Sequence, residues 1–159
     1  MKTIVRSEEE CEKLWFYGGG VHRWKVTAEE TPGSVGIFED TLERGKTTPL
    51  HTHPDSDEIV YVLEGEILVH NDGNPRTVRQ GGVVITPRGV PHALVVTSER
   101  ARILAITTPA ANMEAFYRKA STPGETGPVD FGKIGQAATE TGATVILGPP
   151  PFATSDKRV

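Results

Sequence analysis

The sequence predicts an all-β protein built as a barrel or sandwich of short strands. Between residues 34 and 108, apolar stretches of strand length alternate with turn signals, and no long helical pattern separates them. The 17 glycines and 12 prolines favour many tight turns. One of these turns, at residues 71–74 (Asn-Asp-Gly-Asn), has the residue types that a β-hairpin needs where φ is positive.

The 159 residues fit one domain, in which we expect three parts. Residues 1–33 form an N-terminal arm with a strand and a short helix, which Ser7 and Glu10 would begin as a capping box. Residues 34–108 form the barrel. Residues 109–159 form C-terminal helices and a tail that pack on the barrel, since residues 110–121 carry apolar side chains at helical spacing and a second helical stretch ends near residue 142.

Composition and charge argue against several classes of function. The net charge of −4 and the scattered Lys and Arg residues provide no basic surface for nucleic acid. No apolar run approaches the roughly 20 residues that span a bilayer, and the N-terminus lacks the apolar segment of a signal peptide. A single cysteine, Cys11, excludes an internal disulfide and fits a reducing compartment. We therefore expect a cytoplasmic protein that acts on a small molecule.

Three histidines and one glutamate form a candidate metal site. His51 and His53 are two residues apart, so in a strand their imidazoles lie on the same face. Glu58 follows a short turn and opens the next strand, and His92 follows the rigid turn of residues 87–91. Three imidazoles and one carboxylate suit a divalent transition metal ion such as Fe, Ni, Mn, Co, Cu or Zn.

For other residues near these stretches we predict only whether the side chain is buried or exposed. Two histidines are expected at the surface or in packing: His22 and His70. Four aromatic residues either belong to the core or cover the open end of the barrel over an aromatic ligand: Trp15, Phe16, Tyr17 and Trp24. Four strand residues should line the interior: Val60, Val62, Ile85 and Leu94. Only one of Ile37 and Phe38 can point inward. Two residues should face solvent: Tyr61 and Arg88.

The same residues carry a family resemblance. The stretch 45–65 resembles the first cupin motif at its fixed positions, which are Gly45, His51, His53, Glu58 and Gly65. The stretch 81–92 resembles the second motif at Gly81, Pro87, Gly89 and His92. The chain departs from the family at Val96, where an Asn that is not a metal ligand is frequent. The resemblance implies the cupin double-stranded β-helix, a jelly-roll barrel with short C-terminal helices, and a metal ion bound by His51, His53, Glu58 and His92.

The segment after the barrel resembles one group within this family. Its TPA sequence, its MEAFYRKA helix and its GPPPF tail look like those of single-barrel quercetinase-like cupins. This resemblance implies a dioxygenase that uses O2 on a flavonol or another small enolisable or aromatic substrate. Glu58 would then be a metal ligand or a catalytic base, because burial in an apolar barrel tends to raise the pKa of a carboxyl group.

Two other functions stay open. A cupin isomerase or cyclase would use the same metal ion as a Lewis acid, and a third possibility is a small-molecule-binding cupin without catalysis. We also expect a homodimer, since the exposed edges of an antiparallel sheet need protection.

Overall fold

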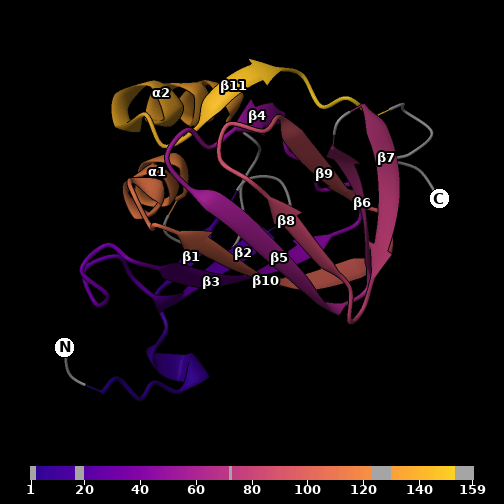
Figure 1. Ribbon diagram of the computed structural model, residues 1–159. Coiled ribbons are helices and arrows are strands. Elements are labelled where there is room, and N and C mark those ends of the chain that lie inside the picture. Colours follow the sequence, from indigo (N-terminus) through magenta and orange to yellow (C-terminus); the bar gives the residue numbers. More distant parts are fainter. Residues whose placement is uncertain (1–2, 17–19, 72, 123–129, 153–159) are drawn as a thin grey trace.

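Two antiparallel β-sheets curve around a shared interior, with two helices beside them (Figure 1). The computed structural model describes residues 3–16, 20–71, 73–122 and 130–152. The described elements, in chain order, are a 3₁₀ helix (Glu8–Glu10), β1 (Lys13–Trp15), β2 (Gly20–Val26), β3 (Gly36–Glu43), β4 (Leu50–Thr52), β5 (Asp57–Glu64), β6 (Glu66–Asn71), β7 (Asn74–Arg79), β8 (Val83–Thr86), β9 (His92–Val96), β10 (Arg100–Thr108), α1 (Met113–Ala120), α2 (Phe131–Thr141) and β11 (Val145–Gly148).

The strand order confirms the predicted all-β jelly roll. One sheet has the order β1-β2-β3-β10-β5-β8, and the other has the order β11-β4-β9-β6-β7. The predicted hairpin between β6 and β7 is present, although Asp72 in its turn lies outside the described residues. The predicted capping box of Ser7 and Glu10 is also present. None of the helices in the described part of the chain is long and apolar enough to cross a membrane.

Alternation along the strands puts one set of side chains into the core. Phe38 is only 1% exposed while its neighbour Ile37 is half-buried, so Phe38 is the one that points inward. Val60 and Val62 on β5 are buried as predicted, and Tyr61 between them faces outward. The two sheets therefore share an apolar interior.

The prediction that Ile85 lines the interior is wrong, because its side chain is 61% exposed. The register of the β5–β8 pair explains this. Glu58 and Val60 face inward and lie opposite Thr86 and Val84, so the alternate residues of β8 point outward. Four consecutive residues, VVIT, hide this alternation in the sequence.

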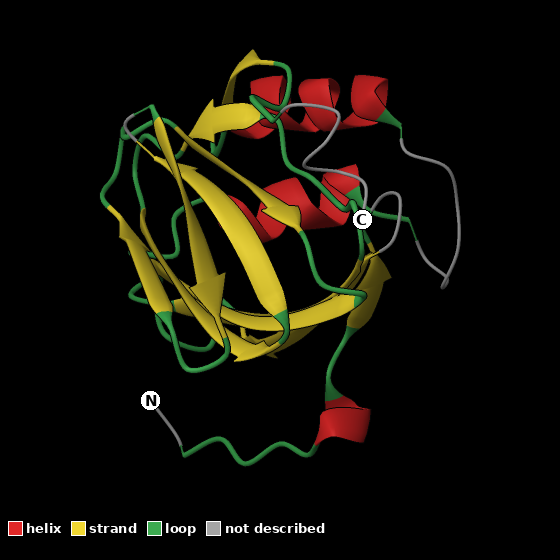
Figure 2. Cartoon of the chain, turned by 90° about the vertical axis from the view of Figure 1, so that its right-hand side faces the viewer, coloured by secondary structure: helices red, strands yellow, loops and turns green. Residues whose placement is uncertain are grey.

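The two predicted C-terminal helices lie side by side at one end of the barrel (Figures 1 and 2). On α1 the buried face consists of Met113, Phe116, Tyr117 and Ala120. The second helix, α2, ends at Thr141 and is capped by Gly142 in the left-handed conformation, as its sequence predicts. After α2 the chain forms β11, which pairs with β4 at the edge of the smaller sheet. The chain after the barrel therefore returns to the strand that carries His51.

Candidate metal centre

The structure brings the four predicted ligands to one point inside the barrel. His51 lies on β4, His53 follows that strand, Glu58 lies on β5 and His92 is the first residue of β9. The β4–β9 pairing sets His51 directly opposite His92. One nitrogen from each of the three imidazoles lies within 4.8 Å of the other two. Histidines that are 39 or more positions apart in the sequence thus meet through strand pairing.

Backbone carbonyl groups fix the orientation of the three imidazoles. Each Nδ1 atom contacts one carbonyl oxygen, at 2.8 Å for His51 and Pro49, 3.0 Å for His92 and Val90, and 3.2 Å for His53 and Ala143. Because a carbonyl oxygen only accepts, these contacts favour a proton on each Nδ1, and in the neutral imidazole this leaves the lone pair on Nε2. The Nε2 atoms of His53 and His92 are buried and have no hydrogen-bond partner among the described residues. Such nitrogens fit a metal ion.

Glu58 completes the cluster from the opposite sheet. Its carboxylate oxygens lie 3.2 Å from Nε2 of His92 and 3.7 Å from Nε2 of His53, and the nearer contact lacks the alignment of a hydrogen bond. Burial alone would raise the pKa of Glu58, but the polar contact with His92 and the charges of the imidazoles outweigh it and lower the pKa to about 2. The expected raised pKa is therefore wrong, since three imidazoles and not only apolar groups surround this carboxylate.

Burial also keeps two of the imidazoles neutral. Desolvation, helped by the neighbouring imidazoles, lowers the pKa of His51 to about 3, and desolvation likewise lowers the pKa of His53. Burial opposes the charged form of His92 as well, yet the adjacent Glu58 carboxylate prevails and raises its pKa. Two of the candidate ligands, His51 and His53, are thus neutral, as a metal ligand must be, and the third, His92, has an interaction with Glu58 that depends on protonation.

A salt bridge that the sequence did not predict joins the segments before Glu58 and His92. Arg88 was expected to be solvated, and its side chain is indeed half exposed, but its guanidinium lies 2.9 Å from the Asp57 carboxylate. The backbone N–H of Arg88 also donates to Asp57 at 2.8 Å. In addition, the N–H of Gly89 donates to the carbonyl of His53 at 2.9 Å. The turn before His92 is therefore bound both to Asp57, next to Glu58, and to the backbone of His53.

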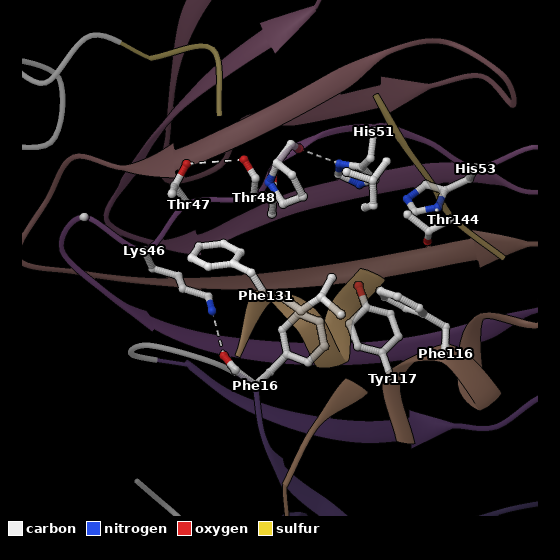
Figure 3. Close-up of a pocket in the computed structure, with 14 residues that line it drawn as sticks. Phe16, Lys46, Thr47, Thr48, His51, His53, Phe116, Tyr117, Phe131 and Thr144 are labelled. Atoms are coloured by element: carbon white, nitrogen blue, oxygen red, sulfur yellow. Dashed lines mark hydrogen bonds between the residues drawn. The ribbon is translucent and has the colours of Figure 1, made fainter. Parts of the chain in front are cut away.

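Aromatic side chains wall a cavity beside His51 and His53 (Figure 3). The cavity has a volume of about 110 Å³, and its lining includes Phe16, Phe116 and Tyr117. Phe16 is thus a wall residue, whereas Trp15 and Trp24 are buried in the core. Tyr17 lies outside the described residues. A larger hollow beside β7 and β8 includes none of the four predicted ligands, so we take the smaller, aromatic cavity as the candidate substrate pocket.

A buried polar pair, His22 and Asp40, packs against Tyr117 of the cavity wall. His22 is fully buried, as a packing residue should be, and its Nδ1 lies 2.7 Å from the Asp40 carboxylate. Its ring also stacks on Tyr117 with a centroid distance of 4.3 Å and an angle of 18°. His70, by contrast, lies outside the cluster and makes an edge contact with Phe152. The sequence has no local signal for the His22–Asp40 pair, because it forms across neighbouring strands.

Comparison with known proteins agrees with this architecture. Residues 38–107 match the family model of the cupin domain. Quercetin 2,3-dioxygenase from Bacillus subtilis (strain 168) is 33% identical over 107 residues, which cover 67% of this chain and 31% of that protein. Germin-like protein subfamily 2 member 2 from Arabidopsis thaliana is 38% identical over 76 residues, which cover 42% of this chain and 35% of that protein. The chain spans about a third of the length of these relatives.

Solved structures share the fold. KdgF from Halomonas sp. superposes with a TM-score of 0.62 at 18% identity, over 68% of this chain and 94% of that one. An RmlC-like cupin from Shewanella frigidimarina NCIMB 400 gives a TM-score of 0.62 at 19% identity, over 71% of this chain and 96% of that one. These two structures show the shared fold, and the domain match together with the similarity to quercetin 2,3-dioxygenase shows that the chain belongs to the cupin superfamily.

Proposed function

We propose that this chain is a metal-dependent cupin enzyme in which His51, His53, Glu58 and His92 hold one divalent transition metal ion. The observation that carries this proposal is the orientation of the three imidazoles. Their Nδ1 atoms are engaged by backbone carbonyls, and nitrogens of all three converge within 4.8 Å. Burying two Nε2 atoms without a partner is costly, and a metal ion removes that cost.

The residues around the ion would have distinct roles. A bound ion of this kind supplies Lewis acidity, or redox chemistry with O2 if it is redox-active. Glu58 is ionised and can accept a proton from a substrate hydroxyl, the first step in forming an enolate. Its low pKa makes it a weak base while it faces His92, so the contact at 3.2 Å would have to loosen during turnover. The aromatic walls exclude water from the reacting groups.

The reaction that we propose is a dioxygenation of the quercetinase-like type on a small enolisable or aromatic substrate. The similarity to quercetin 2,3-dioxygenase over 107 residues supports it, as do the aromatic walls of the pocket. The partners would be O2 and the small molecule. We further propose a homodimer in the cytoplasm, for which a single cysteine and the open sheet edges are the reasons.

Oxygen uptake tests this function directly. Metal-free protein is reloaded separately with Fe, Mn, Co, Ni, Cu and Zn and offered flavonols and other enolisable phenols. We expect O2 consumption that depends on both metal and substrate, and none in the His51→Ala variant. Stoichiometric metal binding without any O2 consumption would refute the dioxygenase and leave a Lewis-acid enzyme or a binding protein.

A further inference from the structure

A threonine that follows α2 contacts one of the candidate metal ligands. The Oγ1 atom of Thr144 lies 3.2 Å from Nδ1 of His53, although the two residues are 91 positions apart. Both residues are buried, with Thr144 3% and His53 4% exposed. Figure 3 shows them together in the wall of the aromatic cavity. Within the described part of the chain, the hydroxyl group of Thr144 has no other hydrogen-bond partner.

The backbone around Thr144 explains why this contact forms. Helix α2 is followed by Gly142, whose φ of +65° ends the helix and turns the chain. The chain then enters β11, where Val145 lies opposite Thr52 of the antiparallel strand β4. Continued by one residue in each strand, this register sets Thr144 opposite His53. The pairing of β11 with β4 therefore carries the threonine to the metal cluster.

The Ala143 carbonyl decides the direction of the hydrogen bond between Thr144 and His53. Its oxygen also lies 3.2 Å from Nδ1 of His53, and a carbonyl oxygen can only accept. An unprotonated Nδ1 would present its lone pair to this oxygen, which is unfavourable. A proton on Nδ1 is therefore favoured, shared between the carbonyl and the hydroxyl oxygens. In neutral His53 the lone pair is then on Nε2, which is buried and has no hydrogen-bond partner among the described residues.

His53 differs in this respect from the other two histidines of the cluster. Nδ1 of His51 and Nδ1 of His92 each contact a carbonyl group only two positions earlier in the chain. Those contacts belong to the local backbone of the histidine itself. Both Nδ1 contacts of His53 come from the segment after α2, and both are longer, at 3.2 Å. Of the side chains that the structure describes, only that of Thr144 makes a hydrogen bond to an Nδ1 atom of these three ligands.

We propose that Thr144 is a positioning residue of the metal centre, which holds His53 in the orientation and tautomer that leave Nε2 for the ion. The hydroxyl group acts through His53 and does not itself bind the ion. Partners of this kind orient ligating histidines, and their loss typically lowers metal affinity about 10–100-fold. The segment after α2 is then part of the metal site, although it lies outside residues 38–107 that match the cupin domain. This inference rests on the proposed function, because it takes His53 as a metal ligand.

The Zn²⁺ affinity of two Thr144 variants tests the inference. Thr144→Val replaces the hydroxyl with a methyl group at similar volume, and Thr144→Ser keeps the hydroxyl. Affinities are measured on the whole chain by competition with a chromophoric chelator. We expect Thr144→Val to bind Zn²⁺ about tenfold or more weakly than the wild type, and Thr144→Ser to stay within about threefold of it. Thr139→Val is the matched control, because Thr139 is exposed on α2 and donates to Gly135; its affinity should be unchanged.

Two outcomes of these titrations would overturn the proposal. Thr144→Val might bind Zn²⁺ as tightly as the wild type or more tightly, which is expected if the hydroxyl donates to an unprotonated Nδ1. Thr144→Ser might lose as much affinity as Thr144→Val, which would assign the effect to packing of the methyl group. Melting curves of the metal-free variants show that each one is folded before its affinity is compared.

Nitrogen-15 NMR of the metal-free protein separates this inference from the proposed function. Burial lowers the pKa of His53, so its ring is neutral at pH 7 and its two nitrogen signals report the tautomer. We expect the Nδ1–H tautomer in the wild type and in Thr144→Ser, and a tautomer ratio shifted about threefold or more toward Nε2–H in Thr144→Val. Absence of Zn²⁺ binding by the wild type would refute the proposed function, while these signals would still decide whether Thr144 sets the tautomer. Identical His53 signals in all three proteins would overturn the role of Thr144.

Discussion

A substitution at Gly65 should destabilise the barrel much more than the same substitution at another glycine of similar conformation. Gly65 joins β5 to β6 with φ of +79°. An added Cβ would lie 2.2 Å from the carbonyl oxygen of Arg100 and 2.6 Å from the hydroxyl oxygen of Ser98. Gly89 has φ of +76°, yet a Cβ there would meet nothing within 4 Å. Gly89→Ala is thus a matched control for backbone strain without the clash.

The two variants should differ by the energy of that clash. A left-handed conformation costs an alanine about 1–2 kcal/mol, which applies to both positions. Gly65→Ala adds overpacking of about 1–3 kcal/mol, because the opposing oxygen belongs to the backbone of β10 and is held in the pairing of Arg100 with Glu43. Each kcal/mol lowers the melting temperature of a domain of this size by about 2–4 °C. We expect a loss of about 2–8 °C for Gly89→Ala and roughly 4–20 °C for Gly65→Ala.

Thermal unfolding followed by circular dichroism, with calorimetry to obtain the enthalpy, measures both losses under identical conditions. Gly65→Ala should melt at least about 2 °C below Gly89→Ala when both are measured in the same buffer. Equal melting temperatures would mean that the strand ends yield to the methyl group, and would refute the argument from the close approach of Arg100. A displacement of β5 by this clash would also affect the candidate metal site, since β5 carries Glu58.

Three further predictions concern the site and its support. Glu58→Gln should keep the fold and much of the metal but lose turnover, because the proton acceptor is gone; unchanged rates would remove Glu58 from the mechanism. Metal affinity should rise as the pH increases through about 6.5 and beyond, because the pKa of His92 is raised and its proton must leave before the metal binds; titrations that are flat from pH 6 to 8 would contradict this. Asp40→Ala should cost about 1–3 kcal/mol in chemical unfolding by leaving buried His22 without its partner at 2.7 Å, and an unchanged midpoint would refute that role.

The proximity of His51, His53 and Glu58 could be predicted because their signal is local. His51 and His53 are two positions apart on a strand, so their side chains lie on one face. The short turn before Glu58 returns the chain to the same point. The structure brings these side chains together with His92. Strand alternation likewise predicted that one of Ile37 and Phe38 would face inward, and Phe38 does.

Features that depend on long-range pairing and that no motif marks could not be predicted. The carbonyl that orients His53 belongs to Ala143, which is 90 positions away and reaches the site only because β11 pairs with β4. The outward direction of Ile85 depends on its register with β5, which four consecutive strand-forming residues do not reveal. The burial of Lys46 could not be predicted either, because a lysine in a turn-like stretch is normally exposed to solvent.

The aromatic walls described above come from parts of the chain that the cupin-domain match does not include. That match spans residues 38–107, whereas Phe16 precedes it and Phe116 and Tyr117 follow it. The candidate metal ligands lie inside the matched region, so they and the aromatic walls belong to different parts of the chain. A change confined to these flanking segments would alter the aromatic walls and leave the candidate metal site in place. Substrate assignments within this superfamily should for this reason be compared over the helical extension as well as over the barrel.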